Sequence, residues 1–185
     1  MAMSSILIGL AVLGYGVTVG VSLLALRKGA SGGRPRMDNL HWLACAIFFS
    51  SLVVIRAFDL EERVRATLRS FAQDENLYAD RFAWQAPLAA IAALLGIILV
   101  WLAVRSFPGK GSPPRLAVWI SRQAVLLFIP LFAMRIISLH AVDSLLYSGP
   151  VRLNWLLEAG LTLTALLAAA MYVRGLGKPR FRDRE

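Results

Sequence analysis

The feature of this sequence that most limits its possible folds is a series of long apolar runs separated by charged stretches. Apolar residues make up 58% of the 185 residues and charged residues only 17%, against roughly 45–50% and about 25% in ordinary soluble domains. About 20 helical apolar residues, each rising 1.5 Å, cross the roughly 30 Å hydrocarbon core of a bilayer. The pattern therefore predicts an all-α, polytopic membrane helix bundle. It excludes a disordered chain and argues against a soluble enzyme.

Residues 1–185 are expected to form a single membrane domain with five transmembrane helices. The predicted spans cover about residues 5–26, 40–57, 83–104, 116–139 and 151–173. The charged stretch 58–78 after the second span repeats Leu60, Val64, Leu68 and Phe71 at helical spacing, which predicts an amphipathic outer helix in the headgroup layer or extending the span. Residues 27–39 are expected to form a flexible basic loop, and residues 174–185 a polar tail.

The distribution of Lys and Arg predicts the orientation in the membrane. Residues 27–39, 105–115 and 174–185 together hold twelve basic and three acidic residues, a net charge of +9. The other connecting segments hold Arg and acidic residues in near balance, with acids such as Glu61, Glu62 and Asp74. Because cytoplasmic loops collect Lys and Arg, we expect the N-terminus outside and the C-terminus in the cytoplasm, in a bacterial inner membrane.

The basic balance of the whole chain does not predict a nucleic-acid partner. The formal net charge is +9, which in a soluble protein would suggest an anionic partner, but here the positive-inside bias accounts for it. The single cysteine, Cys45, allows no intrachain disulfide and no cysteine-based metal cage. His41 and His140 are predicted at opposite membrane faces. No metal or other cofactor is therefore expected, nor a Cys–His pair, since Cys45 and His140 differ in depth.

Small residues in the first span predict a close helix–helix contact. Gly16 and Gly20 form a G-x-x-x-G pattern, which lets two helices approach closely. We expect this face to pack inside the chain, and the alternative is a seam with a second copy or another membrane protein. Membrane lipids are expected around the remaining surface.

Polar side chains within the predicted spans mark the candidate site, because a charge in lipid is costly without a partner or a role. Arg135 in the fourth span and Glu158 in the fifth are predicted at matching depth in the outer half of the bundle. We expect them to form a buried ion pair. Asn154 lies four residues before Glu158 and thus on the same helix face. Arg56 and Asp59, at the end of the second span, are candidates for the same cluster.

A possible catalytic pair follows the fourth span. His140 and Asp143 are three residues apart, so Asp143 would be placed to orient the His140 ring, as in general-base pairs. The alternative is structural, because an interfacial histidine is usually solvated or capping a helix.

Three functions remain open from the sequence. The first is a scaffold or accessory subunit of an inner-membrane assembly. The second is a lipid-facing enzyme with His140 as base, Asp143 as its orienting group and Arg135 holding an anionic headgroup. The third is an oligomeric transporter or channel, for which a polar track between both surfaces would be needed. A closed bundle with its buried charges mutually satisfied would favour the scaffold.

Overall fold

The computed structural model describes residues 2–74, 81–109, 112–137 and 153–176. In these residues the chain is all-α. The helices are α1 (Ala2–Ser31), α2 (Arg36–Ala57), α3 (Leu60–Asp74), α4 (Arg81–Arg105), α5 (Pro113–Ile137) and α7 (Leu153–Leu176). The predicted fold class is thereby confirmed.

Five of these helices are long and apolar enough to cross a membrane. Their candidate spans are Ile6–Ser31, Arg36–Ala57, Ala86–Arg105, Pro113–Met134 and Asn154–Leu176. The remaining helix, α3, carries the charged stretch after α2, and its described apolar side chains Leu60 and Val64 are exposed. The five predicted spans are therefore confirmed as helices that could cross a membrane, and the chain is an integral membrane protein. The placement of α3 in the headgroup layer stays a prediction.

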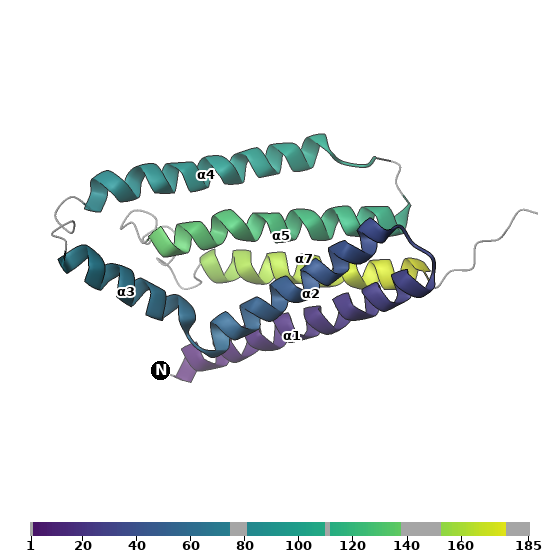
Figure 1. Cartoon of the computed structure of the whole chain (residues 1–185), viewed down its shortest axis with the longest axis horizontal. Coiled ribbons are helices and arrows are strands. Elements are labelled where there is room, and N and C mark those ends of the chain that lie inside the picture. Colours follow the sequence, from purple (N-terminus) through teal and green to yellow (C-terminus); the bar gives the residue numbers. More distant parts are fainter. Residues whose placement is uncertain (1, 75–80, 110–111, 138–152, 177–185) are drawn as a thin grey trace, which may run out of the picture.

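The helices form a bundle in which α1, α2, α5 and α7 pack together and α4 lies to one side. α1 packs along α2 and α7, α7 packs along α5, and α4 packs along α5. Figure 1 shows α4 on the far side of α5 from α1 and α2. Gly96 of α4 faces Pro130 of α5, where a Cβ on Gly96 would lie 3.6 Å from the Pro130 Cβ. This small residue lets α4 lie close to α5.

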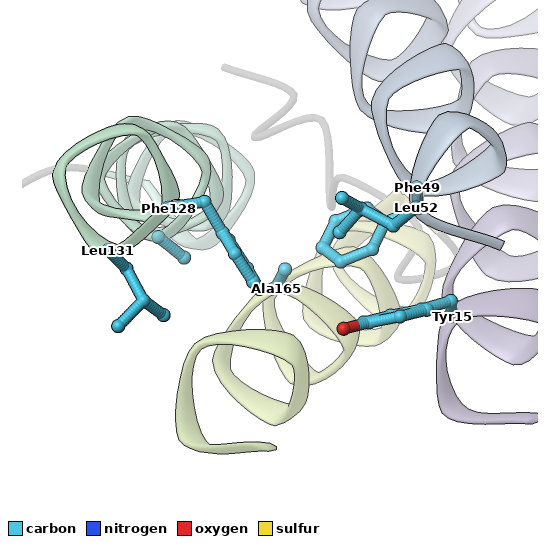
Figure 2. Close-up of a cluster of buried hydrophobic side chains, with 7 residues drawn as sticks. Tyr15, Phe49, Leu52, Phe128, Leu131 and Ala165 are labelled. Atoms are coloured by element: carbon cyan, nitrogen blue, oxygen red, sulfur yellow. The ribbon is translucent and has the colours of Figure 1, made fainter. Parts of the chain in front are cut away.

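The core sits where side chains of α1, α2 and α5 converge on α7. Figure 2 shows Tyr15, Phe49 and Phe128 pointing towards the region around Ala165. The Phe49 and Phe128 rings meet edge to face with centroids 5.9 Å apart, an arrangement that aromatic pairs favour. Ala165 leaves room for these rings, since a larger side chain on α7 would occupy the same space.

A second buried cluster lies nearer the end of the bundle where α1 and α7 stop. The ring centroids of Trp42 on α2 and Tyr172 on α7 are 5.1 Å apart. Ala25, Ala117 and Ala169 pack in the same cluster. The two clusters together hold four of the spans at fixed rotation about their axes.

The connection between α1 and α2 is shorter than the sequence predicts. α1 continues past Arg27 to Ser31, and α2 begins at Arg36, so residues 32–35 form a turn in place of a long loop. Gly33 has φ +62, a conformation that favours glycine. Backbone N–H groups of Gly32 and Arg34 donate to the carbonyls of Lys28 and Gly29 at 3.0 and 3.1 Å, which closes the end of α1.

Candidate functional site

Glu158 of α7 is the centre of a buried polar cluster. Its side chain is only 5% exposed. Arg56, in the last turn of α2, donates from Nη2 to Oε1 and Oε2 of Glu158 at 2.9 and 2.6 Å. A charge-assisted contact of this length offsets the cost of burying both groups.

Three further side chains complete what we call the Glu158 cluster: Tyr15, Glu61 and Trp155. The Tyr15 hydroxyl donates to Glu158 Oε1. Arg56 Nη1 lies 3.6 Å from Glu61 Oε2, and the Arg56 guanidinium carbon lies 5.6 Å from the centre of the Trp155 ring. The cluster thus ties α1, α2, α3 and α7 together at one end of the bundle.

The turn between α2 and α3 brings Glu61 to Arg56. α2 ends at Ala57, and the next backbone bend places Asp59 at φ +48, a conformation that Asp tolerates better than most residues. Asp59 also accepts the backbone N–H of Arg63 at 3.2 Å, which starts α3. Without this bend, Glu61 would continue around the axis of α2 and point away from Glu158.

Glu158 is paired with Arg56, while the predicted partner was Arg135. Arg135 lies in α5, which packs against α7, but its side chain falls outside the described residues, so its pairing with Glu158 stays a prediction. Arg56 was predicted as an additional member of the cluster, and the structure places it in direct contact with Glu158. Tyr15 was missed, because a tyrosine inside an apolar run carries no charge to mark it.

The other predicted members are dispersed or not described. Asn154 is 1% exposed one helical turn before Glu158, and its Oδ1 has no hydrogen-bond donor among the described residues. Asp59 is exposed at the α2–α3 turn. The candidate catalytic residues His140 and Asp143 lie in residues 138–152, outside the described residues. Their proposed partnership therefore stays a prediction.

Buried hydroxyls near the Glu158 cluster are satisfied within their own helices. Thr18 donates to the Gly14 carbonyl at 2.8 Å, and Thr162 donates to the Glu158 carbonyl at 2.7 Å. Such bonds to the preceding turn are how hydroxyls are accommodated inside membrane helices. These two side chains therefore do not extend the cluster into a chain of mutually bonded polar groups.

A Cys–His pair is present, contrary to the prediction. Cys45 Sγ lies 3.4 Å from His41 Nε2 and 3.4 Å from Ser121 Oγ. The prediction rested on the different depths of Cys45 and His140, but His41 lies one helical turn before Cys45 on the same face. Thiol–imidazole contact is typical of activated nucleophiles, but Cys45 is 2% exposed. The contact therefore fits packing between α2 and α5 better than reaction with a substrate.

Gly16 and Gly20 face out of the bundle. Both are exposed, and a Cβ built on either would meet nothing within 4 Å. The expectation that this pair packs inside the chain is therefore wrong for the described residues. Gly14 fills that role instead, because its Cβ position lies 3.8 Å from Thr162 Cγ2 of α7. The alternative, a seam with another chain, stays a prediction.

The described residues contain no group of three His, Cys, Asp or Glu side chains placed to hold a metal ion. Comparison of the chain with known protein families, with curated proteins and with solved structures gives no match.

Proposed function

We propose that this protein is a scaffold or accessory subunit of a membrane assembly. The observation that carries the proposal is the closure of the Glu158 cluster. Arg56 bonds both carboxylate oxygens of Glu158, and Tyr15 bonds one of them. Buried charges that satisfy one another fix the rotation and register of helices, which is the property that a scaffold needs.

The same closure weighs against Glu158 as a transport or catalytic group. A carboxylate that moves protons or ions has to exchange partners with water or substrate. Glu158 instead lies beneath Tyr15 and Arg56, and the nearby Thr18 and Thr162 hydroxyls bond their own helix carbonyls. The alternative with His140 and Asp143 as catalytic residues rests on side chains outside the described residues.

The face of α1 that carries Gly16 and Gly20 is the proposed association surface. Both glycines are exposed beside Leu13 and Val17, which are 65% and 45% exposed. Glycines four residues apart on an outward helix face let a second transmembrane helix approach closely enough for backbone contact. The proposed partner is therefore another transmembrane helix, from a second copy or from a different membrane protein.

The experiment compares glycine substitutions on two different outward helix faces. Gly16→Leu with Gly20→Leu blocks the proposed surface, and Gly160→Leu is the matched control, since Gly160 is also exposed with nothing within 4 Å of its Cβ position. The chain is purified in mild detergent after chemical cross-linking in the membrane. We expect the wild type and Gly160→Leu to carry the same cross-linked partner and the double variant to lose it.

Two outcomes would overturn the proposal. One is a wild-type chain that stays monomeric and without partners in membranes and in mild detergent. The other is an association that survives Gly16→Leu with Gly20→Leu, which would remove α1 as the contact surface. Measurement of the thermal midpoint of each variant separates lost association from lost folding.

A further inference from the structure

A pocket of about 1040 Å³ lies at the opposite end of the bundle from the Glu158 cluster. It is an open pocket lined by the end of α1 and the following turn, by the start of α5, and by the last turns of α7. In Figure 1 these three elements meet at the end where the yellow part of α7 stops. Ligand pockets are commonly about 300–1,000 Å³, so this one has room for a polar headgroup.

Among the residues that the structure describes, the charged side chains that line this pocket are all positive. Lys28 of α1, Arg34 of the α1–α2 turn and Arg174 of α7 contribute, and the described lining residues include neither Asp nor Glu. Like charges placed around one space repel one another unless an anion lies between them. The pocket therefore has the charge expected of a site for a phosphate or another multiply charged anion.

Helix-end stabilisation does not account for all three cations. Lys28 and Arg174 lie in the last turns of α1 and α7, where a positive charge interacts favourably with the helix dipole. Arg34, however, belongs to the turn after α1, whose terminal carbonyls at Lys28 and Gly29 already accept backbone N–H groups. The positive-inside bias explains why basic residues gather in this segment, and a shared anion would explain why three of them line one pocket.

The position of the pocket relative to the membrane indicates where the anion comes from. Three candidate spans begin or end at residues that line it: Ser31, Pro113 and Leu176. The ends of transmembrane helices lie at the level of the lipid headgroups. Met171 and Leu176 add apolar surface on the bundle side of the pocket, as a site for a molecule that is part polar and part hydrocarbon requires.

We propose that this pocket binds the phosphate headgroup of an anionic phospholipid, with Lys28, Arg34 and Arg174 as its cationic ligands. Basic pockets between transmembrane helices are known to take lipid phosphates. The ligand class is therefore an anionic glycerophospholipid, such as phosphatidylglycerol, held from the membrane and not from solution. This site does not depend on the proposed role as an assembly subunit.

The test measures lipid retention by native mass spectrometry of the full chain titrated with phosphatidylglycerol or phosphatidylcholine. The pocket variant combines Lys28→Gln, Arg34→Gln and Arg174→Gln. The matched control combines Arg27→Gln, Arg36→Gln and Arg115→Gln, which are exposed at the same end of the bundle and do not line the pocket. Both variants lose the same charge, so general attraction to an anionic surface falls equally in both.

We expect the wild type and the control variant to retain one phosphatidylglycerol in preference to phosphatidylcholine. The pocket variant should bind phosphatidylglycerol about 1,000-fold more weakly than the control variant, since each lost contact between a charged side chain and the phosphate contributes roughly a factor of ten in affinity. Equal losses in both triple variants would overturn the proposal, because the attraction would then be unspecific.

A second variant keeps all three charges and fills the space. Ser31→Trp places a large side chain at the pocket wall, where Ser31 is exposed at the end of α1. We expect it to lose phosphatidylglycerol as the pocket variant does, with an unchanged thermal midpoint. Undiminished binding would place the lipid elsewhere. Displacement of phosphatidylglycerol by millimolar inorganic phosphate or glycerol phosphate would also overturn the lipid assignment in favour of a soluble anion.

Discussion

Glu158 is buried in an apolar bundle, where side chains of two other helices form hydrogen bonds with its carboxylate. Arg56 reaches it from α2 with bonds of 2.6 and 2.9 Å, and Tyr15 reaches it from α1. Removal of one partner from such a group is costly because the remaining charge keeps its desolvation penalty. The stability of this end of the bundle should therefore depend on these individual side chains.

Glu158→Gln should lower the free energy of unfolding by about 3 kcal/mol, the usual cost of breaking a buried ion pair from one side. The change preserves the shape of the side chain but leaves Arg56, whose side chain is 14% exposed, without its closest opposite charge. Unfolding in mixed detergent micelles measures the loss. Glu62→Gln is the control, since Glu62 is exposed on α3. An equal effect at Glu62 would contradict a specific contribution from the pair.

Tyr15→Phe should cost about 1 kcal/mol, because it removes one hydrogen bond to a charged group and leaves the ring contact with Phe49 intact. The Tyr15 and Phe49 ring centroids are 6.1 Å apart, and this packing does not need the hydroxyl. A double-mutant cycle with Glu158→Ala isolates the bond. If Tyr15→Phe were equally destabilising in the Glu158→Ala background, the hydroxyl would contribute through a different contact.

At the scale of elements, glycines with different surroundings should respond oppositely to the same substitution. A Cβ added at Gly29 would lie 2.5 Å from Asn39 Oδ1 and 3.0 Å from the Tyr172 hydroxyl oxygen. Gly29→Ala should therefore displace the end of the Asn39 side chain and shift the Tyr172 hydroxyl by a few tenths of an ångström, at a cost of about 1 kcal/mol.

The matched change is Gly160→Ala in α7. Nothing lies within 4 Å of its Cβ position, and alanine is the better helix former, so the thermal midpoint should stay constant or rise. Thermal unfolding of both variants in the same detergent compares them. A Gly29→Ala protein as stable as the wild type would contradict a tight contact of Gly29 with Asn39 and Tyr172.

The elements themselves were largely predictable from the sequence, because hydrocarbon thickness sets the length of every span. The same physics explains what was missed. The depth of a residue in the membrane can be estimated from its position in a span, and this estimate predicted Arg135 and Glu158 at the same depth. The sequence does not show which helices are neighbours in the bundle. For this reason the contact between Arg56 of α2 and the Glu158 carboxylate could not be predicted as the main pair. The His41–Cys45 contact could have been predicted from the sequence, since residues four apart in a helix lie on the same face.

At the scale of the whole molecule, the structure separates two chemically different ends. The Glu158 cluster, with its two carboxylates and one guanidinium, lies at the end with α3. The three cations of the basic pocket lie at the other end, with the α1–α2 turn and the end of α7. By the positive-inside rule, such a difference in charge between the two ends predicts the orientation of a membrane protein, with the basic end in the cytoplasm.

The orientation can be tested with two serines that become cysteines. Ser70 lies exposed on α3 and Ser31 lies exposed at the end of α1, and Cys45→Ser removes the native thiol from both variants. Because the basic segments 27–39, 105–115 and 174–185 are expected on the cytoplasmic side together with Ser31, Ser70→Cys should react with an impermeant maleimide in intact spheroplasts. Ser31→Cys should react only after the membrane is opened. The reverse pattern would place the C-terminus outside, and labelling of both in intact spheroplasts would contradict a single orientation.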